Sequence, residues 1–208
     1  SGHGTKIILT SNAHPNDLYL DGLQRQKFLA SLKIFLENVN IHKLDGDIDY
    51  RTRNIIKFDE HDSNKIISDE EIFKFIIDNF GLDQQKSNQI SINDRKFTCK
   101  LVSNNILWIE FNDFFAEATG SKDYTYISNK FDWVFISNFK KNNDDTIDII
   151  RRFISFIDIT YTNRTKIKFF FNDIDIENIY TGSKIENLWV RCKSRLSEMR
   201  TQEYLTNN

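Results

Sequence analysis

The spacing of apolar residues alternates between two periods along this chain. Spacings of three and four place side chains on one face of a helix. They predict a turn and then a helix in 16–38, ending near Asn38, and helices in these segments: 68–81, 123–131, 146–161 and 186–205. Alternating or continuous apolar runs are typical of strands, and they mark these segments: 5–10, 39–44, 50–56, 89–92, 96–102, 106–111, 133–136 and 166–171. The pattern therefore predicts an α/β fold.

Local signals set the ends of several elements. Ser68 precedes three acidic residues and predicts a helix N-cap, while Gly81 is suited to end the same helix. Asn93-Asp94 and Ser103–Asn105 predict hairpin turns, so the strands on either side of them form an antiparallel meander.

A second kind of unit is predicted further along the chain. The strand at 133–136, the helix at 146–161 and the strand at 166–171 follow one another closely. This order indicates a βαβ unit with a right-handed crossover, which requires parallel strands.

The stretch near the amino end joins an apolar run to polar residues. Ile7-Ile8-Leu9 is short and β-branched enough for a buried parallel strand, and Thr10-Ser11-Asn12 follows it directly. In α/β sheets, polar residues at the carboxyl end of a strand lie where ligands bind. Since the next helix carries Arg25, the stretch is a candidate nucleotide-sensing edge, although by itself Asn12 is more simply the cap of a turn.

Composition narrows the class of protein. The 208 residues are 39% hydrophobic and 28% charged, with a net charge of -2. These values fit a globular chain with no bulk attraction to nucleic acid. Two cysteines are too few for a disulfide framework, and no apolar run approaches the roughly 20 residues of a membrane span.

The sequence lacks the common motifs for phosphate and metal binding. Its seven glycines never have the spacing of a G-x-x-x-x-G-K-[S/T] loop. Ile55–Glu60 imitates an apolar strand that ends in two acids, but Lys57 interrupts it, so we interpret it as an ordinary strand before a polar loop. Asp45, Asp47 and Asp49 lack the spacing of a calcium hand, and the histidines and cysteines lack metal-ligand spacing.

Blocks of residues at both ends of the chain resemble one family. In chain order they are Thr10-Ser11-Asn12, Pro15-x-Asp17-Leu18-Tyr19, Gly22-Leu23-Gln24-Arg25-x-x-Phe28-Leu29, Leu44-Asp45-Gly46-x-x-Asp49-Tyr50-Arg51, Arg151-Arg152-Phe153-Ile154, Arg191-Cys192-x-Ser194-Arg195-Leu196-x-Glu198-Met199 and Glu203-Tyr204-Leu205. Together they look like the ZapE-type, or Afg-one-like, AAA+ ATPases. A match of this extent is far more specific than a single short motif.

The resemblance implies a division of the chain into two parts. Residues 1–58 would be the carboxyl-terminal part of a P-loop NTPase (AAA+) core, and residues 59–208 a mixed α/β lid and family-specific region that holds the meander. The phosphate-binding loop and the acidic magnesium-site strand would lie upstream of Thr5. We therefore expect ATP and Mg²⁺ to be bound mainly by residues outside this chain, and the chain alone to be inactive.

Four residues receive nucleotide roles from the resemblance. Asn12 would be the sensor-one residue that positions the attacking water. Arg25 would be the arginine finger that reaches the nucleotide of a neighbouring subunit, the alternative being a solvated helix arginine. Either Arg151 or Arg152 would be the sensor-two arginine that links the γ-phosphate to the lid, and the sequence does not choose between them.

Three further residues are expected to hold structure rather than to take part in catalysis. Arg191 and Arg195 are four apart, and Glu198 lies three beyond Arg195, so they share one region of a helix surface. We interpret them as an ion network at a domain or subunit seam.

The resemblance also implies an oligomeric ATPase, a ring of identical subunits that couples ATP hydrolysis to protein remodelling. Its partners would be copies of itself and a client or division protein, with no nucleic acid. Its location would be the bacterial cytoplasm or the mitochondrial matrix, with peripheral membrane association also expected. Cell division and protein quality control are the implied roles.

A second class of function stays open at this point. The aromatic-rich meander could belong to a non-catalytic interaction module that recruits a protein or stacks bases, through these side chains: Phe97, Trp108, Phe111, Phe114 and Phe115. Aromatic residues in alternating strands are more often core, and base stacking also needs a basic groove.

Overall fold

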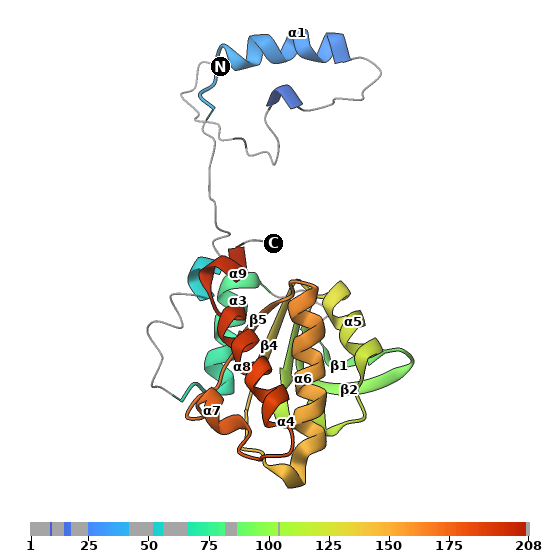
Figure 1. The fold of residues 1–208 in the computed structure, drawn as a ribbon. Helices are drawn as coiled ribbons and strands as arrows, with labels where there is room; N and C mark the ends of the chain where they lie inside the picture. The colour runs from blue at the N-terminus through green and yellow to red at the C-terminus, as the bar shows by residue number, and fades with distance from the viewer. Residues whose placement is uncertain are drawn as a thin grey trace. The chain divides into compact units, whose positions relative to one another are not determined.

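The structure, a computed structural model, consists of two units, Ser1–Asp45 and Gly46–Asn208 (Figure 1). It describes the following residues: 9, 15–17, 25–41, 52–55, 66–81, 87–103 and 105–206. The functional boundary predicted between residues 58 and 59 falls outside these ranges and stays a prediction.

The first unit contains a short 3-10 helix, η1 (Pro15–Asp17), and helix α1 (Arg25–Leu36). The Asn38 side chain donates to the carbonyl of Ile34 at 2.8 Å just beyond the end of α1. The prediction of a turn followed by a helix that ends near Asn38 is confirmed. The predicted strand at 5–10 lies outside the described residues except for Leu9, and 39–41, the described part of the other predicted strand, carry no strand.

A five-stranded sheet forms the centre of the second unit. Its strands lie in the order of the chain: β1 (Ser87–Ile92), β2 (Arg95–Ser103), β3 (Ile106–Glu110), β4 (Trp133–Ser137) and β5 (Lys166–Phe169). β1, β2 and β3 pair antiparallel, whereas β3, β4 and β5 pair parallel. The predicted meander (β1, β2 and β3) and the predicted βαβ unit (β4 and β5 with the helix between them) are both confirmed. The two meet where β3 pairs with β4.

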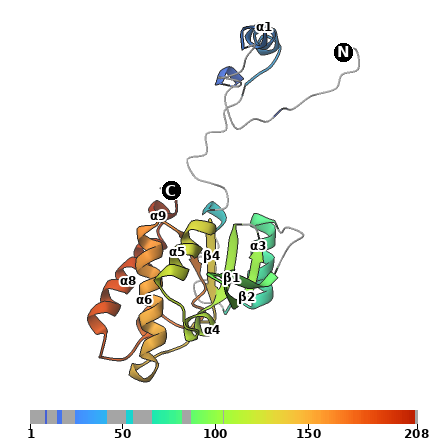
Figure 2. The same cartoon turned by 90° about the vertical axis from the view of Figure 1, so that its right-hand side faces the viewer.

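Helices cover both faces of this sheet (Figure 2). Helix α3 (Asp69–Phe80) lies on one side, where Phe80 packs its ring 5.8 Å from Trp133 and 5.5 Å from Phe135. The other side carries these helices: α4 (Phe111–Ala116), α5 (Ser121–Lys130), α6 (Ile147–Thr162) and α8 (Glu186–Met199). Short elements complete the unit: η2 (Asp144–Thr146), α7 (Ile176–Ile179) and α9 (Gln202–Thr206).

The predicted ends of α3 are confirmed. The Ser68 hydroxyl accepts from the amide of Glu71 at 3.3 Å, and the Glu71 carboxylate accepts from the amide of Ser68 at 2.9 Å, which is a capping box. At the other end Gly81 has φ of 70°, a left-handed value that glycine adopts without steric cost.

The turn between β1 and β2 is the predicted two-residue hairpin. Ile92 pairs with Arg95, and the two residues between them, Asn93 and Asp94, have φ of 48° and 63°. Two successive positive φ values are those of a type I′ turn, whose twist matches that of the strands.

Two further predicted extended segments are wrong where the structure describes them. Residues 52–55, expected within an extended piece, form a helical turn. The turn places Thr52 and Ile55 on one side, both 1% exposed, while Asn54 donates to the Asn79 side chain of α3 at 2.6 Å. Phe111, expected to end a strand, begins α4 instead.

The predicted helix at 186–205 is interrupted. Helix α8 ends at Met199, and α9 begins at Gln202. The hydroxyl of Thr201 accepts from the amide of Tyr204 at 3.2 Å and so caps the new helix, because it satisfies one of its free amides.

The aromatic residues considered for a binding surface lie in the core. None of the five is more than 5% exposed: Phe97, Trp108, Phe111, Phe114 and Phe115. In α4, Phe111 and Phe115 pack their rings 4.9 and 5.3 Å from Phe153 of α6. The alternative of an interaction module that uses these rings is therefore wrong, since they cannot reach a partner.

Candidate functional site

Arg25 is the first residue of α1, and its side chain reaches η1. Its guanidinium donates to the backbone carbonyl of Asn16 at 3.4 Å, which ties α1 to η1. The side chain is half-buried. Asn12, the other residue assigned to catalysis, lies outside the described residues.

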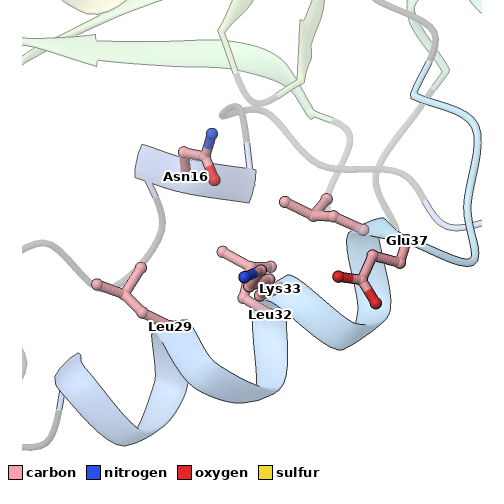
Figure 3. A pocket seen from close by; sticks show the side chains of 6 residues that line it. Asn16, Leu29, Leu32, Lys33 and Glu37 are labelled. Carbon is pink, nitrogen blue, oxygen red and sulfur yellow. The ribbon is translucent and has the colours of Figure 1, made fainter.

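Beside this contact, η1 and α1 enclose an open groove of about 340 Å³ (Figure 3). Leu29, Leu32 and Leu36 supply its apolar wall, and the charged residues Lys33 and Glu37 lie at its rim. Leu32 is buried, but Leu29 is 38% and Phe35 40% exposed. Helix α1 thus leaves much of its apolar surface open within its own unit.

Arg151 and Arg152 are adjacent in α6 but have different surroundings. Arg152 is half-buried, and its Nη1 donates to the carbonyl of Phe115 at 3.0 Å and to that of Ala116 at 3.4 Å. Arg151 is exposed and makes no hydrogen bond or ion pair within the described part of the chain. The structure thus distinguishes two arginines that the sequence alone does not distinguish.

The chain between α4 and α5 follows the two carbonyls that Arg152 contacts, and the β1–β2 hairpin holds it from a second side. Arg95 donates to the carbonyl of Ala118 at 2.6 Å and to the carboxylate of Asp123 at 2.5 Å. The same carboxylate accepts from the Asn93 side chain at 3.0 Å and from the amide of Gly120 at 2.9 Å. A shallow cavity of about 410 Å³ opens at this corner.

Asp123 is 2% exposed, and its ionisation is set by these donors. Burial alone raises the pKa of a carboxyl, but the hydrogen bonds from Arg95, Asn93 and Gly120 outweigh it and lower the pKa of Asp123 below 3.8. Tyr124 beside it donates to or accepts from Thr119 at 2.8 Å, and burial raises its pKa to about 12. No pattern in the sequence indicates this cluster, because its members come from the β1–β2 turn, from β2 and from the start of α5.

Arg191 and Arg195 meet on one carboxylate of α6. Arg191 lies 2.7 Å from Asp158, and Arg195 also pairs with Asp158 through its other oxygen. Glu198, expected beside Arg195, accepts from the hydroxyl of Tyr161 at 2.7 Å. These residues join two helices of the same unit, α6 and α8.

A second cluster forms where α6 and α8 begin. The carboxylate of Asp144 accepts from the hydroxyl of Tyr180 and from the amides of Ser183 and Lys184, both at 3.1 Å. The hydrogen bond from Tyr180, followed by those from the two amides, lowers the pKa of Asp144 to about 2. Gly182 lies so close that a Cβ there would overlap the Asp144 carboxylate and the Tyr180 ring.

The carboxyl edge of the parallel strands, where α/β proteins commonly bind ligands, holds a third cluster. Lys100 lies 2.8 Å from the carboxylate of Asp69 and 3.2 Å from that of Glu110, and Asn138 also donates to Glu110. The hydrogen bond to Asp69, together with the attraction of Glu110, raises the pKa of Lys100. Lys100 is shared between the two carboxylates and ties α3 to the end of β3.

The described residues contain no metal cluster, and neither of the two cysteines is an activated nucleophile. No group of three or more His, Cys, Asp or Glu side chains within the described ranges could hold a metal ion. Both cysteines are buried, and burial raises the pKa of Cys99 to about 12 and that of Cys192 further, so neither thiol is activated. In the part of the chain that the structure describes, no helix is long and apolar enough to cross a membrane.

Comparison with known proteins gives consistent matches. The cell division protein ZapE of Escherichia coli is 28% identical over 207 residues, which cover 97% of this chain and 54% of ZapE. An uncharacterized protein of Schizosaccharomyces pombe is 25% identical over 237 residues, 98% of this chain and 51% of that protein. Lactation elevated protein 1 homolog B of Danio rerio is 27% identical over 79% of this chain and 33% of its own length.

The chain thus spans about half the length of the first two of these relatives. No solved structure matches it. The family described as AFG1-like ATPase, whose fold is that of the P-loop NTPases, matches residues 2–208. Because this match takes in nearly every residue, the chain belongs to the AFG1-like ATPase family.

Proposed function

We propose that this chain is the carboxyl-terminal part of an oligomeric AAA+ ATPase that couples ATP hydrolysis to the remodelling of other proteins. The observation that carries the proposal is the family match over residues 2–208. The name of ZapE supports cell division as the process, and a division protein or another client as the partner. The bacterial cytoplasm or the mitochondrial matrix is the proposed location.

In this proposal Asn12 and Arg25 act on the transferred phosphoryl group. Phosphoryl transfer depends mainly on positioning and on charge stabilisation. The Asn12 amide orients the attacking water, and the Arg25 guanidinium offsets the charge that accumulates on the phosphoryl oxygens of a neighbouring subunit. The position of Arg25 at the start of α1, on a half-exposed side chain with a long hydrogen bond to the carbonyl of Asn16, supports such a reach.

Phosphates and Mg²⁺ are assigned to a part of the protein outside this chain. The described residues contain no cluster suited to the metal, and the sequence has no phosphate-binding loop. No step that involves Mg²⁺ is therefore assigned to the residues of this chain.

The test is ATP hydrolysis by the protein that carries the phosphate-binding loop together with residues 1–208. Arg25→Ala should lower kcat by about 10³-fold or more while nucleotide affinity is retained, because a finger acts on the transition state. Lys27→Ala on the same helix is the matched control and should hydrolyse ATP normally, since Lys27 is exposed.

A mixing experiment distinguishes action between subunits from action within one. Arg25→Ala subunits keep their nucleotide site, and subunits that lack the phosphate-binding lysine keep Arg25. Mixed rings should regain activity that neither variant has alone. If mixing restores nothing while both variants still assemble, Arg25 does not act in a neighbouring subunit and this part of the proposal is overturned.

A further inference from the structure

We propose that the two arginines of α6 have separate roles: Arg152 holds the corner between α4 and α5, and Arg151 is the one available to a nucleotide phosphate. The second role rests on the proposed function, whereas the first stands on the structure of this chain alone. Arg152 is thus a positioning residue, not a contact of the nucleotide.

The geometry of Arg152 is that of a helix cap. The carbonyls of Phe115 and Ala116 belong to the last turn of α4, where carbonyls have no partner within the helix. Arg152 donates to both, at 3.0 and 3.4 Å. A cation is favourable at this end of a helix, because the helix dipole is negative there.

Helix α4 depends on such outside support. It has six residues, too few for an isolated helix to be stable in water. Its other supports are the packing of Phe111 and Phe115 on Phe153 and, past its end, the hydrogen bond from Arg95 to Ala118. If the Arg152 guanidinium turned to a phosphate, the last carbonyls of α4 would lose their donor.

Arg151 has no such commitment. Successive residues of a helix point about 100° apart, and Arg151 is exposed with no hydrogen bond or ion pair in the described ranges. A guanidinium with all its donors available suits a phosphate, which it can bind through two parallel hydrogen bonds. Neither of the two cavities described above is lined by Arg151, so the phosphate would be presented by another part of the protein.

The role of Arg152 is tested on the 208-residue chain by unfolding followed through tryptophan fluorescence. All three tryptophans belong to the second unit, so the signal reports its unfolding. Arg152→Ala should lower the midpoint by about 4 °C or more, from the loss of charge-assisted hydrogen bonds, and Arg152→Lys should recover part of the loss. Arg151→Ala is the matched control and should leave the midpoint unchanged.

The role of Arg151 is tested in the protein that hydrolyses ATP. Arg151→Ala should lower kcat or raise KM about 10- to 100-fold, the effect of one charge-assisted hydrogen bond. Arg152→Lys should keep both values near those of the unaltered protein, since the residue at this position caps α4 and does not contact the nucleotide.

The outcomes separate the inference from the proposed function. Equal unfolding midpoints for Arg152→Ala and Arg151→Ala would refute the role of Arg152 as a cap of α4. Normal kcat and KM for Arg151→Ala, in a protein that hydrolyses ATP, would refute its nucleotide contact and leave the ATPase proposal standing. If the unaltered protein does not hydrolyse ATP, the nucleotide role of Arg151 fails with that proposal. The unfolding midpoints still decide whether Arg152 caps α4.

Discussion

The substitution Asp123→Asn tests whether one buried carboxylate fastens the β1–β2 hairpin to α5. The amide is the same size as the carboxyl group, so the change removes a charge and one acceptor without opening a cavity. One carboxylate oxygen of Asp123 accepts from both Arg95 and the amide of Gly120, at 2.5 and 2.9 Å, and the other accepts from the side chain of Asn93. If the oxygen of the new asparagine takes the first position, its NH₂ group faces the Asn93 donor. At least one donor of the three therefore loses its partner.

The size of the effect follows from burial on the two sides of the ion pair. Breaking a fully buried pair by removing one partner costs about 3 to 5 kcal/mol. Asp123 is buried, but the Arg95 side chain is 46% exposed and is rehydrated when the charge is lost, so we expect about 2 to 3 kcal/mol. For a unit of this size, that is a fall in the unfolding midpoint of about 4 to 12 °C.

The assay is thermal or urea unfolding of the chain, followed by the fluorescence of its tryptophans. Asp113→Asn, an exposed carboxyl on α4, is the control and should change stability by no more than about 0.5 kcal/mol. The pKa of Asp123 is lower in the folded state than the ordinary 3.8, so the unfolded state binds the proton more tightly. The stabilisation is therefore complete above that ordinary value and is lost as the pH falls through the folded pKa.

The free energies of unfolding of the unaltered chain and of Asp123→Asn should accordingly differ by a constant amount from about pH 5 upward. They should converge in stronger acid. An Asp123→Asn protein that unfolds together with the Asp113→Asn control would show that the carboxylate does not fasten the hairpin. A difference that persists unchanged at the lowest pH would show that packing, and not charge, carries the effect.

Other substitutions test other parts of the second unit. Gly182→Ala should cost about 1 to 3 kcal/mol, because its Cβ would overlap the Asp144 carboxylate and the Tyr180 ring; a variant that melts like the unaltered chain would contradict this packing. Ser68→Ala should cost about 1 kcal/mol through loss of the α3 N-cap, measured by the same unfolding. Asp158→Asn should cost no more than about 1 kcal/mol, because the pair with its two arginines is partly exposed, and the cost should vanish in 1 M salt if it is electrostatic.

Elements whose causes are local could be predicted from the sequence. The capping box of Ser68 spans four residues, and the Asn93-Asp94 turn needs only its own backbone preferences. β4, buried along all five residues, follows from the unbroken apolar run of its first four. In each case the residues that determine the structure are neighbours in the chain.

Elements whose causes lie far away in the chain could not be predicted. α4 begins in an apolar stretch that fits the period of a helix as well as that of a strand. Its end is held by an arginine 37 residues away. The turn at residues 52–55 is fixed by Asn79, 25 residues further on. The different surroundings of Arg151 and Arg152 follow from that same distant contact, so the sequence motif alone left the pair undivided.

The open surface of α1 bears on how the first unit works. Its exposed apolar side chains include Ile34 at 66% and Phe35 at 40%, on the helix that begins with Arg25. A unit of 45 residues has too little interior to bury such side chains unaided, and apolar surface of this kind marks an interface. The proposal that Arg25 works at a contact between subunits accounts for both features, because a surface that delivers the guanidinium to a neighbour also covers the apolar face of its helix. Exposure of α1 and the reach of Arg25 are then two consequences of one arrangement.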